Sequence, residues 1–242
     1  DVTDFPVLVR LNASNFSFNE SLDPGDTGAD VRFAASNGAH LSYEIERWDD
    51  SVDSAEIWVK IPTVYGNNGT QYFTMHWGKS GVTSTSDGSA VFSTGNGFAG
   101  VWHLSEDASG IGTADLYKDA TANANHGLDS VSSTTKTGLI GKGQDFTGAN
   151  NVISMADDNS LDFGTGPFTV SAWLQTTQVP GATSYAHLVS KYGGTPKYGW
   201  EITFHNQTKS GEPYLKVSSN DASSGTSGTD RKSTRLNSSH YS

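Results

Sequence analysis

The chain has 242 residues, of which 34% are hydrophobic and 17% charged, and its net charge is −11. This length is enough to bury a sizeable core, and the absence of cysteine excludes a disulfide framework and a thiolate zinc site. The acidic balance argues against nucleic acid as a partner, because binding to a phosphate backbone depends on Lys and Arg. No apolar run approaches the roughly 20 residues that a membrane-spanning helix needs. Since residue 1 is Asp and no signal peptide precedes it, we expect a fragment or a processed chain.

Hydrophobic residues alternate with polar ones in the first third of the chain. The runs are FPVLVRL (5–11), EIWVKIP (56–62) and YFTMHWG (72–78). Such alternation is typical of half-buried antiparallel strands, because successive side chains point to opposite faces. Turn-rich strings such as YGNNGT (65–70) separate the runs. Residues 1–79 are therefore predicted to form a first β-sandwich domain.

Residues 80–95 are polar and rich in small side chains, which is typical of a linker or a long loop. Ala90, Val91 and Phe92 are the residues expected to dock locally.

The alternation returns in FTVSAWLQ (168–175) and WEITFHN (200–206), and we find no window with sustained helical periodicity. SLDF (160–163) is expected to form at most a single helical turn. The sequence thus predicts an all-β chain of two sandwiches, the second spanning residues 96–229.

The last residues, DRKSTRLNSSHYS (230–242), resemble the translation of a sequencing adapter. This tail contains two of the five arginines, and residues 81–229 contain none. Residues 230–242 are therefore interpreted as a non-native tail, and the second domain as incomplete. An ordinary basic C-terminal tail is the alternative.

Five phrases in the second half carry a resemblance to a known family. They are FAGVWHLSE (98–106), KDATANANHG (118–127), GLIGKGQDFTGANNVISM (138–155), SLDFGTGPFTVSAWLQ (160–175) and LVSKYG (188–193). This segment resembles the laminin-G-like branch of the concanavalin A-like lectin/glucanase superfamily. The resemblance implies a two-sheet jelly roll, here lacking its last strands, and such a truncation predicts exposed strand edges and poor solubility.

The first half is similar to an uncharacterised bacterial domain that often precedes laminin-G-like modules. The matching phrases are DFPVLVRL (4–11), GADVRF (28–33), LSYEIERWD (41–49), AEIWVKIP (55–62) and YFTMHWGK (72–79). The resemblance implies export from a bacterial cell and further domains in the same chain. It assigns no activity.

Glu44 and Glu46 share one face of a predicted strand, with backbones roughly 6.5–7 Å apart. Glycoside hydrolysis needs such a carboxylate pair, but the third acid of the glucanase pattern is missing, because Trp48 and Asp49 follow. The alternative is structural ion pairing, of Glu46 with Arg47 or of Glu44 with Arg32. A third acid across a groove would support catalysis, whereas burial of the pair in ion pairs would exclude it.

The loop DLYKDATANAN (115–125) concentrates oxygen-bearing side chains, and calcium prefers about six to eight oxygen ligands. Many laminin-G-like domains bind calcium in the corresponding loop. We predict Asp119, Asn123 and Asn125 as the candidate calcium ligands. The alternative is Asx-turn chemistry, in which Asp119 and Asn123 bond to their own backbone.

Aromatic residues provide a further hypothesis, since they can stack on sugar rings. Tyr185, Tyr192 and Tyr198 lie in turn-rich surroundings and form the candidate ligand platform. Most tryptophans, Trp77 among them, lie in alternating strands and are expected to pack in the core. His103, beside Trp102, is expected to be packed with its hydrogen bonds satisfied.

Together these features predict a non-catalytic binding or adhesion module pair of an exported bacterial surface protein. Its expected ligand is a carbohydrate or an extracellular protein, with calcium as candidate cofactor. The alternatives are accessory modules of a secreted glycoside hydrolase and an architectural spacer in the cell envelope. Fold analogy carries most of this functional prediction.

Overall fold

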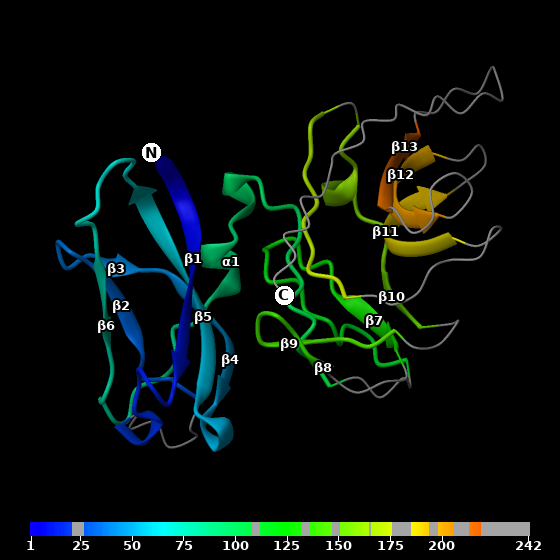
Figure 1. Cartoon of the computed structure of the whole chain (residues 1–242). Coiled ribbons are helices and arrows are strands. Elements are labelled where there is room, and N and C mark those ends of the chain that lie inside the picture. The colour runs from blue at the N-terminus through cyan, green and yellow to red at the C-terminus, as the bar shows by residue number, and fades with distance from the viewer. Residues whose placement is uncertain are drawn as a thin grey trace, which may run out of the picture. The chain divides into compact units, whose positions relative to one another are not determined.

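A computed structural model describes residues 1–20, 27–107, 112–131, 136–146, 151–164, 166–175, 185–193, 198–205 and 213–218. The chain is all-β, as predicted (Figure 1). It divides into two compact units, Asp1–Ser160 and Leu161–Ser242. The non-native tail predicted at 230–242 lies outside the described residues. Within the described ranges, no helix combines the length and the apolar character needed to cross a bilayer.

The first sheet of unit 1 is antiparallel in the order β1-β5-β4, formed by Val2–Asn12, Ser54–Val64 and Tyr43–Asp49. The predicted alternation sets its register, with Val7 opposite Val59 and Ile45 opposite Ile57. Odd-numbered side chains of β5 therefore enter the core, and Glu56 and Trp58 lie on the other face. A β-bulge between Ile45 and Arg47 interrupts the ladder of β4 with β5.

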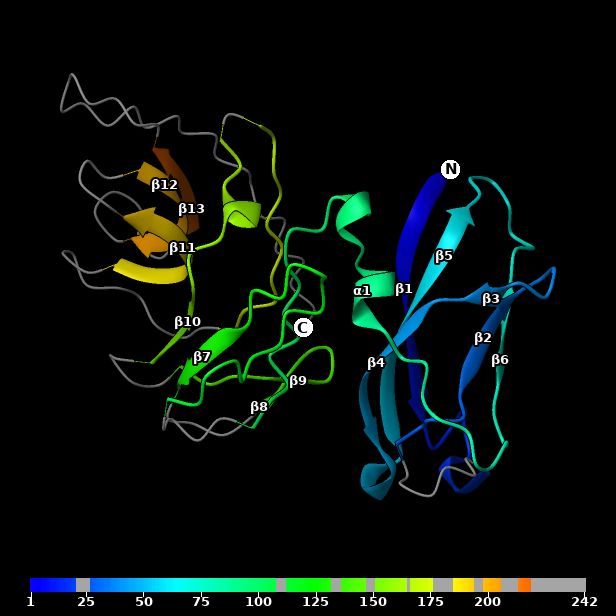
Figure 2. The same ribbon diagram turned by 180° about the vertical axis from the view of Figure 1, so that it is seen from behind.

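The second sheet has the order β3-β2-β6 and packs against the first (Figure 2). Its strands are His40–Leu41, Arg32–Ala35 and Phe73–His76. The core between the layers consists of Leu11, Phe16, Phe18, Val31, Phe33, Leu41, Tyr43, Ala55, Ile57, Val59 and Ile61. Ile57 and Val59 are fully buried, and each contributes about 1.5–3 kcal/mol to folding. The two packed sheets thus form the β-sandwich that the sequence predicts in the first third of the chain.

Residues 80–95 pack along this sandwich. The Ile45 N–H donates to Ser86 Oγ, and the Asp87 N–H donates to the Tyr43 carbonyl. Asp87 then caps α1 (Gly88–Val91) by accepting the Ala90 N–H. Val91 and Phe92 are buried, so the segment docks at the residues expected to do so. The division into domains at 1–79 and 96–229 stays a prediction.

The rest of unit 1 carries two short antiparallel pairs. β7 (Gly127–Ser130) pairs with β10 (Val152–Met155), and β8 (Lys136–Thr137) pairs with β9 (Lys142–Gly143). Buried Tyr117 and Val131 form a small separate core. The remaining short elements are 3-10 turns at Phe18–Glu20, Asp50–Val52, Thr94–Asn96 and Asn159–Leu161. The last is the single turn predicted in SLDF.

The described residues of unit 2 form one sheet in the order β11-β12-β13, with strands Tyr185–Gly193, Tyr198–His205 and Pro213–Ser218. Trp200 of β12 packs against Phe163 and Phe168, with ring centroids 5.6 and 5.4 Å away.

The prediction of a strand at 168–175 is wrong, because these residues form no strand in the structure. Ser171–Gln175 are exposed, and the Trp173 side chain is 74% accessible. Among the described residues no other segment pairs with them as a β-ladder. The alternating pattern therefore lacks the inter-strand hydrogen bonds that define a strand.

Candidate functional site

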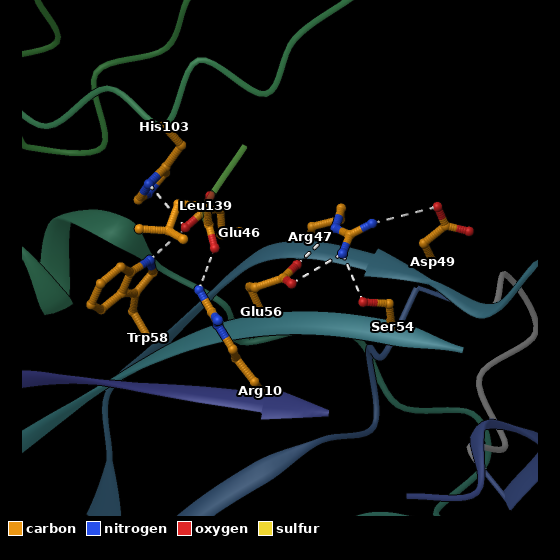
Figure 3. A network of polar contacts seen from close by, with 9 residues as sticks. All are labelled: Arg10, Glu46, Arg47, Asp49, Ser54, Glu56, Trp58, His103 and Leu139. Atoms are coloured by element: carbon orange, nitrogen blue, oxygen red, sulfur yellow. Dashed lines mark hydrogen bonds and ion pairs between the residues drawn. The ribbon is translucent and has the colours of Figure 1, made fainter. Parts of the chain in front are cut away.

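The outer face of the β4-β5 pair carries several charged side chains. Glu44 and Glu46 of β4 lie on this face with Glu56 and Trp58 of β5, and Glu44 is directly opposite Trp58. Figure 3 shows Glu46, Glu56 and Trp58 of this group, with the Glu46 and Glu56 side chains projecting from the two strands. The sequence prediction that Glu44 and Glu46 share a face is therefore confirmed.

His103 lies between the two carboxylates and is 59 residues beyond Glu44 in the chain. Its Nε2 is 2.9 Å from Glu44 Oε2, and its Nδ1 is 3.3 Å from Glu46 Oε2. A charged imidazolium donates from both nitrogens and so satisfies both acids. Trp58 Nε1 also donates to Glu46, at 2.6 Å. The Trp58 ring lies nearly parallel to the His103 ring, with centroids 6.4 Å apart.

Burial and the neighbouring charges shift the pKa values of His103 and Glu46 in opposite directions. Burial by itself favours the neutral imidazole, but the hydrogen bond and charge of Glu44, with the charge of Glu46, outweigh it and raise the pKa of His103. Burial also raises the pKa of Glu46, although His103 and Trp58 act to lower it. The folded protein therefore holds a proton in this cluster more tightly than the unfolded chain does.

Glu44 and Glu46 are engaged in polar contacts within the protein. Their side chains are 14% and 2% exposed, so a sugar ring has little access to either carboxylate. The predicted alternative of ion pairing is thus present, but with a different partner. Arg47 pairs with Glu56, and Arg32 donates to the carbonyls of Ala29, Val31 and Thr83 and to the Tyr43 hydroxyl.

Arg47 forms the second half of the cluster. Its Nε and Nη2 donate to the two oxygens of Glu56 at 2.7 and 3.0 Å, and Nη2 also reaches Ser54 Oγ at 2.7 Å. The hydrogen bond that Arg47 donates to Glu56 raises the pKa of Arg47. Since Glu56 is buried, this fork neutralises a carboxylate that would otherwise be costly.

The chain at residues 139–141 lies over the same face. Arg10 Nη2 donates to the Leu139 carbonyl at 2.5 Å, as Figure 3 shows. Gly141 has a φ of +56°, and a Cβ there would lie 2.9 Å from Glu46 Oε1. Glycine thus allows the backbone to pass close to the carboxylate.

The loop around Asp119 is closed by its own hydrogen bonds. The Asp119 carboxylate accepts from the N–H groups of Val101, Thr121 and Asn125 and from the Thr121 hydroxyl, at 2.9–3.0 Å. An ionised carboxylate has about four lone-pair sites, so these four donors match its capacity. The bond to Thr121 N–H is the Asx turn that the alternative predicted.

The other two candidate calcium ligands also have protein partners. Asn123 Nδ2 donates to the Ala99 carbonyl, and Asn125 Nδ2 donates to Ser160 Oγ, both at 2.8 Å. The Asn125 carbonyl accepts the Trp102 indole N–H. Within the described residues, no group of three or more His, Asp or Glu side chains is arranged to hold a metal. Calcium binding at this loop stays a prediction.

The candidate tyrosine platform falls on the sheet of unit 2. Tyr185 begins β11, and the register places Tyr192 opposite Gly199 and Tyr198 opposite Gly193. Tyr192 and Tyr198 therefore lie at one end of this strand pair and Tyr185 at the other, roughly 20 Å away along the strand. The side chains of Tyr185 and Tyr198 lie outside the described residues, and the platform stays a prediction.

A feature that the sequence did not predict is an open hollow of about 450 Å³ in the first sandwich, which we call the Trp77 hollow. Its lining includes Phe16, Ser17, Asn19, Asp53, Met75 and Trp77. Trp77 was expected in the core, but it follows the end of β6 and is 42% exposed. The position of Trp77 directly before Gly78 is the one signal in the sequence that its strand ends there.

Comparison with known proteins agrees with part of the sequence interpretation. Residues 27–107 match a family described as "Domain of unknown function (DUF2341)". No curated protein and no solved structure matches the chain. The expected uncharacterised β domain is therefore supported in the first half, whereas the laminin-G-like resemblance of the second half stays a prediction.

Proposed function

We propose that this chain is a non-catalytic binding or adhesion module pair of an exported bacterial surface protein, which binds a glycan or a protein partner. The observation that carries the proposal is the closure of the Glu44–Glu46 pair by His103. The carboxylates best spaced for glycoside hydrolysis both contact the half-buried His103 ring and are largely covered, so they are not open to substrate.

Composition supports the extracellular setting. The chain is acidic, contains no cysteine and has 27 glycines, which suits a module stabilised by core burial in place of disulfides. The resemblance of residues 98–210 to laminin-G-like domains favours ligand binding over a purely architectural role. Fold analogy alone does not name the ligand.

The test combines a binding assay with an activity assay on the full chain. We expect the immobilised protein to retain at least one component of a set of bacterial and plant polysaccharides or of extracellular matrix proteins. We also expect no release of reducing ends from the polysaccharides. Hydrolysis that is lost in Glu44→Gln would overturn the proposal in favour of an enzyme, and failure to retain any component would favour the spacer.

A further inference from the structure

We propose that the Trp77 hollow is a carbohydrate-binding subsite that accepts one neutral pyranose ring. The inference rests on the proposed function and names a site and a ligand class for it. The argument depends on how rigidly the hollow is built and on which chemical groups line it.

Trp77 is exposed, yet its backbone is fixed on both sides. Before it, β6 pairs with β2 as far as His76, which lies opposite Arg32. After it, the buried Asp30 carboxylate accepts the N–H groups of Gly78 and Lys79, at 2.7 and 3.3 Å. Gly78 has a φ of +86°, which a residue with a side chain rarely adopts. The backbone that carries the indole is therefore held in place before any ligand arrives, which lowers the entropic cost of binding.

The segment after β1, which also lines the hollow, is held by hydrogen bonds. Asn15 Oδ1 accepts the Asn12 N–H at 2.8 Å, and Asn15 Nδ2 donates to the Arg10 carbonyl, so the turn after β1 is locked. From this turn the chain alternates. Phe16 and Phe18 are buried in the core, whereas Ser17 and Asn19 are exposed on the rim of the hollow. The Phe16 ring also meets the Trp77 ring edge-on, with centroids 5.3 Å apart.

Asp53 supplies the charged group. It lies at the end of the 3-10 turn Asp50–Val52 with a φ of +49°, in the left-handed region. The hollow thus combines a hydroxyl, an amide and a carboxylate with the apolar surfaces of Trp77 and Met75.

This combination matches a neutral sugar better than other small ligands. A pyranose has one face of C–H groups that packs on an indole and a rim of hydroxyls that both donate and accept hydrogen bonds. An anionic ligand would face Asp53, and among the described residues that line the hollow there is no Lys or Arg to compensate. The volume of about 450 Å³ is in the range of small-molecule sites. A protein partner would instead require a patch of about 800 Å².

The test uses the full chain labelled with 5-fluorotryptophan, which gives one ¹⁹F NMR signal for each of the six tryptophans. Trp77→Phe assigns the Trp77 signal. The probes are neutral oligosaccharides of β-glucose, β-xylose, N-acetylglucosamine and mannose. We expect the Trp77 signal to shift with at least one probe, and Trp77→Ala to weaken that binding by at least about tenfold. Asp53→Asn should weaken it as well.

Trp173→Ala is the matched control, because Trp173 is more exposed than Trp77 and does not line the hollow. Binding in this variant should stay within about twofold of the parent. Retention of the other five dispersed ¹⁹F signals verifies that Trp77→Ala is folded. If an oligosaccharide binds equally well to Trp77→Ala, the subsite is wrong and the proposed function stands. If none of the probes shifts the Trp77 signal, the subsite is likewise wrong, and retention of a protein in the earlier assay decides the function separately.

Discussion

Replacing His103 by alanine should strongly destabilise the first compact unit. His103 makes a contact of 2.9 Å to Glu44 and a longer one of 3.3 Å to Glu46. Each hydrogen bond to a charged group contributes about 1.5–3 kcal/mol, and a buried ion pair that loses one partner costs about 3–5 kcal/mol. Since the Glu46 side chain is only 2% exposed, we expect the free energy of unfolding to fall by about 3–5 kcal/mol.

Hydrogen exchange followed by mass spectrometry on peptides from β4 and β5 measures this loss locally, separately from unit 2. His76→Ala is the control, because His76 is exposed and its ring contacts Thr74 Oγ1, and its effect should stay within about 0.5 kcal/mol. Adding Glu44→Gln and Glu46→Gln to His103→Ala should recover part of the loss, because the unpaired charges are then removed. The reasoning is refuted if His103→Ala costs no more than His76→Ala.

The same cluster gives stability a defined dependence on pH. The pKa of His103 is raised above its usual 6.5, so the stability that it contributes is complete below that value. This stability is lost as the pH rises through the higher pKa of the folded state. The raised pKa of Glu46 acts in the same direction, since it also makes the folded state bind protons more tightly. An NMR titration of the His103 ring should give a midpoint above 6.5, and a midpoint at or below it would contradict the proposed imidazolium.

Three further changes test other parts of the structure. Arg47→Ala should lower the free energy of unfolding, measured with urea, by about 3–5 kcal/mol, because Glu56 then remains buried without a partner. Arg47→Lys should restore little of this stability, because lysine cannot donate two parallel hydrogen bonds to the carboxylate. Asp119→Ala should lower the melting temperature even without calcium, since four internal donors lose their acceptor. If the variant instead melts below the parent only when calcium is present, the loop is a metal site. Gly28→Ala should destabilise the folded protein by about 2 kcal/mol or more, because the φ of Gly28 is +70° and a Cβ would collide with the Trp48 ring. An unchanged melting temperature in this variant would refute that packing.

Local sequence patterns were sufficient to predict a strand where the segment pairs with a neighbouring strand in the fold. The alternation in residues 5–11, 56–62, 72–78 and 200–206 corresponds to β1, β5, β6 and β12. It failed at 168–175, because periodicity shows that a segment can form a strand but not which segment will pair with it. The α1 helix was missed because it has four residues, too few for a helical period to show.

At the candidate sites, too, local spacing predicted which residues share a face but not which residues they contact. That Glu44 and Glu46 share a face follows from their spacing by two, a local property of any strand. Their partner does not follow, because the nearest basic residue in sequence, Arg47, lies on the other side of a β-bulge and pairs with Glu56.

The sequence by itself thus determined the all-β class and the strands β1, β4, β5, β6 and β12, because side-chain alternation and turn residues act over a few neighbouring positions. Only the tertiary structure decided that His103 closes the carboxylate pair and that the segments at 13–19, 53 and 75–77 line one hollow. These contacts join residues far apart in the chain. They depend on where the chain after β6 lies against the outer face of β4 and on where β1 and β6 end, and no local pattern encodes that information.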